Sequence, residues 1–216
     1  MSLKIIHTAD WHLGQTFFGY DRDEEHEAFL SWLIDILTLR QTDVLLIAGD
    51  VFDVANPSAA AQRRFFRFLR EANRRNPQLQ IVIIAGNHDS AARLEAPIPL
   101  LEELNTSIVG AVPRTDLCKI DFDSLLIPLY NKEGKREAIC LAVPYLRQGD
   151  YPASKEGKDT YVEGVTRMYR QLYDYADSQR QPGEALLAMG HLRLVLNCRK
   201  TIGANGLSWE DLNLYR

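Results

Sequence analysis

Acidic, amide and imidazole side chains stand at the ends of four apolar runs in this sequence. The runs cover residues 5–9, 44–48, 81–85 and 185–189, and the polar residues that follow them are Asp10, His12, Asp50, Asn87, His88 and His191. Carboxylate and amide oxygens together with imidazole nitrogens form a ligand set that suits manganese, iron or zinc better than copper. The set is too large for one ion. It therefore predicts two divalent metal ions, which Asp50, on the middle run, could bridge with its two carboxylate oxygens.

His88 follows Asn87 directly, and we interpret it as a catalytic residue rather than as a metal ligand. From that position it could face a phosphate ester, stabilise charge in the transition state or protonate the leaving oxygen. Each polar residue also has a structural explanation of its own, since an Asp after a strand often caps a helix and an Asn often lies in a turn. Because that explanation would have to hold at four strand ends at once, we favour the metal site.

The apolar runs themselves predict the strands that carry these side chains. Runs 5–9, 44–48 and 81–85 are short, apolar and bounded by turn signals, as buried strands of a parallel sheet are. The carboxyl ends of such strands meet at one edge, where open α/β sheets place their chemistry. Gly49 would let the backbone come close to whatever Asp50 holds.

A helix is predicted over residues 23–40, after a loop over 15–22. Its apolar stripe at helical spacing is expected to pack on the sheet. The residues of that stripe include Phe29, Trp32, Leu33 and Ile36. His26 lies one turn earlier, and we interpret it as a partly buried helix histidine rather than as a ligand.

A second helix is predicted from Asn56 and Pro57 to about residue 73, with Asn56 as N-cap and Pro57 in the first helical position. Four arginines lie on one narrow stripe opposite its apolar face. They are Arg63, Arg67, Arg70 and Arg74. We interpret this stripe as a solvated face rather than as a contact to the DNA backbone.

The pattern changes after residue 106. Short strands separated by polar turns are predicted over 107–109, 118–122, 125–129 and 138–143, and a further buried strand over 185–189. Residues 131–134 have the composition of a hairpin turn, and a third long helix is predicted over 158–176. A second sheet that faces the first is the natural consequence. The sequence therefore predicts an α/β (α+β) fold of two sheets with helices.

Composition limits the class of protein. The 216 residues suit one α/β domain with at most a small extension, and the net charge of −4 does not by itself indicate a nucleic-acid binder. A local basic patch or bound metal ions would still allow one. The beginning of the chain lacks a signal-peptide pattern, no apolar run reaches transmembrane length, and Cys118, Cys140 and Cys198 are expected to be free thiols. These features predict a cytoplasmic protein without membrane contact.

The polar motifs, taken in order, resemble those of the calcineurin-like metallophosphoesterases. They are Asp-x-His at 10–12, Gly-Asp-x-x-Asp at 49–53, Gly-Asn-His-Asp at 86–89 and Gly-His at 190–191. The resemblance implies a four-layer αββα sandwich of two facing mixed sheets flanked by helices, over residues 1–192. It also implies that Asp10, His12 and Asp50 hold one metal ion. By the same resemblance Asp50, Asn87 and His191 hold the second, and His88 is the catalytic histidine.

Two further motifs resemble the SbcD-type DNA nucleases within that family. They are Asp-Trp-His-Leu-Gly at 10–14 and Glu-His-x-x-Phe-Leu at 25–30. This resemblance implies a manganese-dependent exonuclease or endonuclease subunit that hydrolyses phosphodiesters at double-stranded DNA ends and hairpins, in repair and recombination. It implies two further features, a homodimer and a partner ATPase of the SMC-like SbcC type.

The chain departs from that pattern after residue 192. SbcD-type sequences carry a further Gly-His-x-His that supplies one more ligand to each metal, whereas no histidine follows His191 here. We therefore interpret 193–216 as a divergent or truncated tail, and expect each ion to lack one imidazole and to bind weakly. Two alternatives stay open: a different dinuclear metallophosphoesterase acting on small phosphoesters, and a catalytically impaired fragment.

Overall fold

A four-stranded sheet lies at the centre of the computed structural model, which describes residues 3–101, 104–153 and 160–192. Its strands are parallel in every pair, in the order β1-β4-β5-β6. They are β1 (Ile5–Thr8), β4 (Val44–Ala48), β5 (Gln80–Ile84) and β6 (Thr106–Val109). The parallel pairing predicted from the apolar runs is confirmed. The prediction that the first run is buried is wrong, because β1 is an edge strand of this sheet and leaves Ile5 37% exposed.

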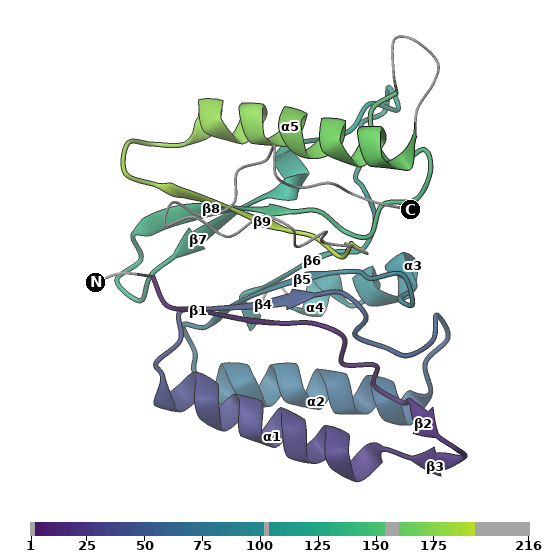
Figure 1. The fold of residues 1–216 in the computed structure, drawn as a ribbon. Coiled ribbons are helices and arrows are strands. Elements are labelled where there is room, and N and C mark those ends of the chain that lie inside the picture. Colours follow the sequence, from purple (N-terminus) through teal and green to yellow (C-terminus); the bar gives the residue numbers. More distant parts are fainter. Residues whose placement is uncertain (1–2, 102–103, 154–159, 193–216) are drawn as a thin grey trace, which may run out of the picture.

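A second sheet of three strands faces the first (Figure 1). It contains β7 (Leu126–Tyr130), β8 (Arg136–Ala142) and β9 (Ala185–Met189). β7 runs antiparallel to β8 through a turn at 131–134, and β9 runs parallel to β8. Within the described residues only this second sheet is mixed, so the expectation of two mixed sheets holds for one of them.

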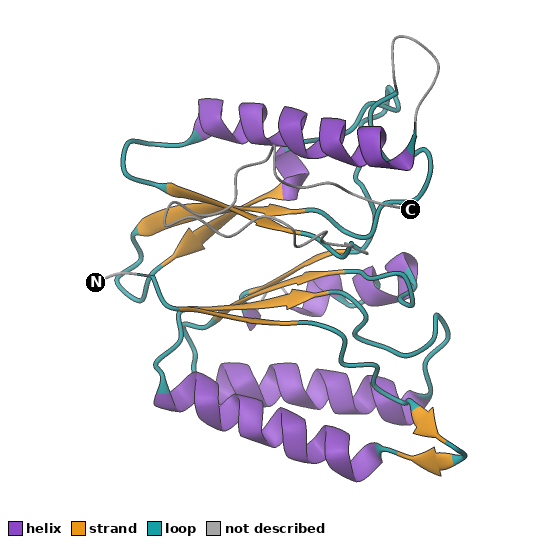
Figure 2. Cartoon of the chain, in the orientation of Figure 1, coloured by secondary structure: helices purple, strands orange, loops and turns teal. Residues whose placement is uncertain are grey.

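Helices cover the outer face of each sheet, as Figures 1 and 2 show. α1 (Asp23–Leu39) and α2 (Ala59–Arg75) lie on the first sheet, and α5 (Tyr161–Gln179) lies on the second. The short helices α3 (Ala91–Glu95) and α4 (Ile98–Leu101) contact β6, and a 3₁₀ turn, η2 (Asp123–Leu125), precedes β7. The predicted αββα layering is therefore confirmed.

The alternation of side chains along β4 and β5 divides the core in two. Leu45, Ile47, Ile81 and Ile83 belong to the cluster under α1 and α2. Leu46, Val82 and Ile84 belong to the cluster between the sheets, which continues beneath α5. Both faces of these strands are buried, which is why they appear in the sequence as unbroken apolar runs.

The face that α1 buries differs from the predicted one. Its buried side chains are His26, Leu30, Leu33, Ile34 and Leu37. Trp32, which was expected to pack on the sheet, is 55% exposed. Burial lowers the pKa of His26, so this histidine is a neutral part of the helix interface.

The start of α2 also differs from the prediction. Ser58, rather than Asn56, is its N-cap, and the Ser58 hydroxyl accepts a hydrogen bond from the amide of Ala61 at 3.1 Å. Pro57 therefore lies before the cap and not in the first helical position. The apolar face expected for this helix is confirmed by the burial of Phe65, Phe68, Leu69 and Ala72.

Three other predicted segments change their assignment. Residues 107–109 belong to β6 and thus to the first sheet. Residues 118–122 form no strand, because Cys118 has a left-handed φ of 56° and closes a turn onto Thr115; only an isolated bridge joins Arg114 to Ile120. The expected loop at 15–22 contains the short hairpin of β2 (Thr16–Phe17) and β3 (Tyr20–Asp21).

No helix in the described ranges is both long and apolar enough to cross a membrane. Cys118 is exposed and free, and Cys140 is buried and free. Burial raises the pKa of the Cys140 thiol to about 12, so it stays protonated. Cys198 lies outside the described residues.

Candidate metal centre

Hydrogen bonds between backbones hold together the loops that follow β1 and β4. The amide of Asp10 donates to the Gly49 carbonyl at 3.1 Å, and the amide of His12 donates to the Asp50 carbonyl at 3.0 Å. Asp10, His12 and Asp50 have left-handed φ values of 57°, 46° and 49°. Such conformations cost about 1–3 kcal/mol each and persist where the surroundings impose them, which is typical of functional sites.

Trp11 anchors the first of these loops. Its indole is only 5% exposed and contacts Phe29, Phe65 and Phe68 beneath the sheet edge. The indole nitrogen donates a hydrogen bond to the Thr8 hydroxyl at 2.9 Å. Because the residue between Asp10 and His12 is fixed in the core, the two flanking side chains are held at the surface of the sheet edge.

Asp50 lies at the centre of the candidate site and is 3% exposed. Its Oδ1 accepts a hydrogen bond from the amide of His88 at 2.9 Å. Its Oδ2 lies 3.7 Å from His12 Nε2 and 3.3 Å from His191 Nε2. One carboxylate oxygen thus stands between imidazole nitrogens that come from opposite sheets.

The first group of donors combines Asp10, His12 and Asp50, whose ligand atoms all lie within 4.8 Å of one another. His12 Nε2 is 4.0 Å from Asp10 Oδ1. The other ring nitrogen, Nδ1, is 3.2 Å from Asp53 Oδ1. His12 Nδ1 makes no hydrogen bond in this arrangement, so its contact with the Asp53 carboxylate is electrostatic, and Nε2 is the ring nitrogen that faces Asp10 and Asp50.

The second group combines Asp50, Asn87 and His191. The Nδ1–H of His191 donates to the Ala48 carbonyl at 2.8 Å, which leaves a lone pair on Nε2. That nitrogen lies 3.2 Å from Asn87 Oδ1 and 3.3 Å from Asp50 Oδ2. When the ring is neutral, His191 Nε2, Asn87 Oδ1 and an oxygen of Asp50 are three electron-pair donors that lie close together, and this donor set fits a divalent ion.

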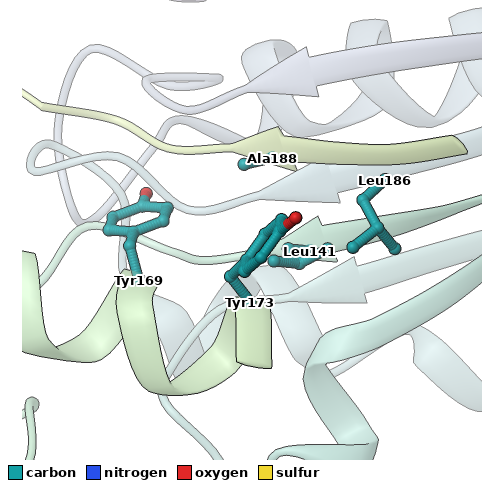
Figure 3. Close-up of a pocket in the computed structure, with 5 residues that line it drawn as sticks. All are labelled: Leu141, Tyr169, Tyr173, Leu186 and Ala188. Carbon is teal, nitrogen blue, oxygen red and sulfur yellow. The ribbon is translucent and has the colours of Figure 1, made fainter. Parts of the chain in front are cut away.

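α5 fixes the end of β9, from which His191 projects. The hydroxyl of Tyr169 donates to the Met189 carbonyl at 3.1 Å. A Cβ on Gly190 would lie 2.0 Å from the same hydroxyl, so only glycine permits this approach. Figure 3 shows Tyr169 beside Ala188, together with Tyr173, Leu141 and Leu186, which line a small apolar hollow between α5 and the second sheet.

His88 lies at the exposed side of the centre. Its Nδ1–H donates to the Asp53 carbonyl at 2.7 Å, and its ring packs edge-on against that of His12 at 5.0 Å. The hydrogen bond to Asp53 raises the pKa of His88, and the nearby carboxylates of Asp50, Asp53 and Asp89 add to this effect. The ring therefore carries more positive charge near neutral pH than a free histidine. His12, Asp53 and His88 also form a possible ligand group, which competes with a purely catalytic role for His88.

Two acidic residues of the motifs, Asp53 and Asp89, could not be assigned a role from the sequence. The Asp53 carbonyl orients His88 through a hydrogen bond, and the Asp53 carboxylate lies against the ring of His12. Asp89 is 3% exposed and accepts hydrogen bonds from the amides of Gly86, Val51 and Phe52 at 2.9, 3.2 and 3.0 Å. Burial raises the pKa of Asp89, although these three donors favour its charged form. It ties the loop after β4 to the loop after β5.

Replacing Gly86 by Ala should disrupt the centre without unfolding the domain. A Cβ on Gly86 would lie 2.1 Å from Asp50 Oδ1 and 2.3 Å from the Asp50 backbone nitrogen. Asp50 must therefore move. We expect manganese affinity, measured by calorimetry, to fall by at least roughly tenfold, the scale of losses when the support of a ligand is removed. Unchanged affinity in this variant would show that Asp50 is not a ligand.

All six residues singled out in the sequence lie at this edge, and the structure adds Asp53 and Asp89 as their supports. Comparisons with known protein families and with curated proteins point to the same family. The family model described as calcineurin-like phosphoesterase matches residues 3–213.

Several curated relatives are named as SbcD, a subunit of the nuclease SbcCD. The one from Rhodobacter capsulatus is 48% identical over 171 residues, covering 79% of this chain and 42% of the relative. The one from Escherichia coli K12 is 32% identical over 202 residues, covering 89% of this chain and 47% of the relative. The one from Bacillus subtilis is 40% identical over 122 residues, covering 56% of this chain and 31% of the relative. The chain thus spans less than half the length of each of these relatives.

Proposed function

Because the chain belongs to the calcineurin-like phosphoesterase family, we propose that it hydrolyses the phosphodiester bonds of DNA and that two divalent manganese ions assist the reaction. One observation carries the proposal. The buried Oδ2 of Asp50 lies between the Nε2 atoms of His12 and His191, as a carboxylate that bridges two ions would. Relatives named as nuclease subunits support DNA as the substrate.

The residues of the metal centre would have separate roles. Asp10, His12 and Asp50 would hold one ion, and Asp50, Asn87 and His191 the other. Such a pair of ions activates water and stabilises the charge of a phosphoryl displacement. His88, held by the Asp53 carbonyl, faces the substrate, where its raised pKa favours the charged form that stabilises phosphate oxygens or protonates the leaving oxygen.

The wider assignment rests on the relatives and on the sequence. We propose that residues 1–192 form the metallophosphoesterase domain and that it acts as the nuclease subunit of an SbcCD-type complex, with an SMC-like ATPase and as a homodimer. Its substrates would be double-stranded DNA ends and hairpins in repair and recombination. The free thiols of Cys118 and Cys140 support action in the reducing cytoplasm. The segment 193–216 lies outside the described residues, so the expectation of weak metal binding stays a prediction.

The test is a substrate comparison with the full chain and added manganese. We expect a linear duplex with one labelled end to be degraded, and degradation to stop on addition of EDTA. Hydrolysis of p-nitrophenyl phosphate without any DNA cleavage would instead support a phosphatase for small esters. Absence of turnover on both substrates would overturn the proposed activity.

The arginine stripe allows a separate prediction about how DNA is held. Arg63, Arg67, Arg70 and Arg74 are exposed, and two of them pair with acids: Arg67 with Glu27 at 3.2 Å and Arg74 with Glu71 at 2.7 Å. We therefore expect that changing all four to Gln leaves the salt dependence of DNA binding unaltered. If the stripe contacted phosphates, the log-log slope would flatten by about 0.9 for each lost contact.

A further inference from the structure

The hairpin of β2 and β3 presents three aromatic side chains to solvent. Phe17 is 65% exposed, Phe18 is 87% exposed and Tyr20 is 78% exposed. The rings of Phe17 and Phe18 contact each other edge-on at 4.6 Å. Contiguous apolar groups on the surface are a feature of binding sites, whereas singly scattered ones are ordinary.

The backbone of this hairpin adopts a strained conformation at the turn that carries the exposed rings. Phe17 pairs with Tyr20, so Phe18 and Gly19 form a two-residue turn, with φ values of 48° and 82°. Turns with positive φ at both positions favour Asn-Gly, and a bulky residue in the first position is unusual. A phenylalanine held there with its ring in solvent indicates a function for the ring.

Hydrogen bonds connect the hairpin to the metal centre. The amide of Gln15 donates to the His12 carbonyl at 3.0 Å, and Gln15 Nε2 donates to Asp53 Oδ1 at 3.2 Å. Arg22, at the other end of the hairpin, donates from Nη1 to Gln15 Oε1 at 2.8 Å. Asp53 is the residue that lies against His12. Figure 1 shows the hairpin at the end of the molecule toward which β4 points.

We propose that Phe17, Phe18 and Tyr20 form a stacking platform for an unpaired base of the DNA strand that enters the metal centre. This inference rests on the proposed function. Aromatic faces accept any base, because every base has a π-face. The platform would hold the frayed end of a duplex beside the metal centre and so favour cleavage at ends.

The charges around the hairpin favour a base over a phosphate. Asp21, Glu24 and Glu25 are exposed beside it, and these acids repel a phosphate backbone. The one basic residue of the hairpin, Arg22, is engaged by Gln15. A protein partner is a poorer fit, because a hairpin of two two-residue strands is small beside the roughly 800 Å² that each side of a stable interface contributes.

The test uses the full chain in EDTA and a duplex with a frayed end that carries 2-aminopurine as its last base. Stacking quenches the fluorescence of this base analogue, so we expect quenching by the wild-type protein. Phe18→Asn removes a ring and gives the turn its favoured Asn-Gly pair, which preserves the hairpin. Combined with Phe17→Ser and Tyr20→Ser, it should abolish quenching and weaken end binding by roughly 5- to 100-fold.

The salt dependence of binding separates stacking from charge effects. Loss of stacking should leave the log-log salt slope unchanged, because no phosphate contact is removed. Leu117→Ser serves as the matched control, since Leu117 is 78% exposed elsewhere on the surface and should not alter quenching.

Manganese-dependent hydrolysis of bis(p-nitrophenyl) phosphate should be retained in the triple variant, because the metal centre is intact. Unchanged quenching and end affinity in that variant would overturn the platform, even where the wild-type protein cleaves DNA. A triple variant that binds DNA normally but loses self-association or a protein partner would do the same, and would make the hairpin a protein contact. Absence of all hydrolysis by the wild-type protein would count against the proposed function. Quenching and end affinity, which need no hydrolysis, would still decide whether the platform exists.

Discussion

Replacing Asp50 by Asn is expected to abolish metal-dependent cleavage while the fold is retained. The amide has nearly the volume of the carboxylate and can still accept the hydrogen bond from the His88 amide. It cannot supply the negative charge that two cations would share between His12 and His191. We expect activity on a small diester and on DNA to fall by roughly 10⁴-fold or more, the scale seen when an essential member of a catalytic unit is removed.

The control for this variant is Asp35→Asn. Asp35 is 63% exposed and pairs with Arg75 on the outer helix layer, so it reports the effect of losing a carboxylate far from the centre. Both variants should show the circular dichroism spectrum of the wild-type protein. Full nuclease activity after Asp50→Asn would refute the bridging assignment.

Replacing His88 by Ala should separate catalysis from metal binding. His88 Nδ1 is occupied by the Asp53 carbonyl, and the ring lies at the exposed side of the centre. We expect manganese affinity close to that of the wild-type protein and a chemical step slower by about 10²–10⁴-fold, the usual contribution of a general acid or a charge stabiliser.

Calorimetry decides between the two interpretations of His88. Because one ligand atom from each of His12, Asp53 and His88 lies within 4.8 Å of the other two, a loss of bound metal in this variant would make His88 a ligand. His7→Ala is the matched control, since His7 is an exposed histidine on the edge strand β1. It should change neither metal binding nor rate.

The central strands and the polar residues behind them were predictable because burial on both faces leaves an unbroken apolar run. Val44–Ala48 is such a run, and it ends at Asp50. β1 has a similar composition, yet it is an edge strand. An apolar run does not specify which strands pair with it, so the position of β1 in the sheet was not predictable. The same limit explains why residues 107–109 were assigned to the wrong sheet.

The supports of the site were not predictable, because they depend on contacts between distant loops. Asp89 accepts amides from residues 51 and 52, and nothing in the local sequence specifies that pairing. The contact between Asp53 and His12 also joins two distant loops, so the local sequence does not specify it either. The hairpin at 16–21 was missed because its turn holds Phe-Gly in place of the Asn-Gly that signals such turns.

Manganese titration of the full chain, followed by electron paramagnetic resonance, tests the two-metal assignment most directly. A carboxylate bridge holds two ions about 3.5–4 Å apart, close enough for their spins to couple. We predict that two manganese ions bind per chain at saturation, that they give the spectrum of a coupled pair, and that Asp50→Asn removes the coupling. One ion per chain, or two ions without coupling in the wild-type protein, would contradict the assignment of Asp50 as the bridge.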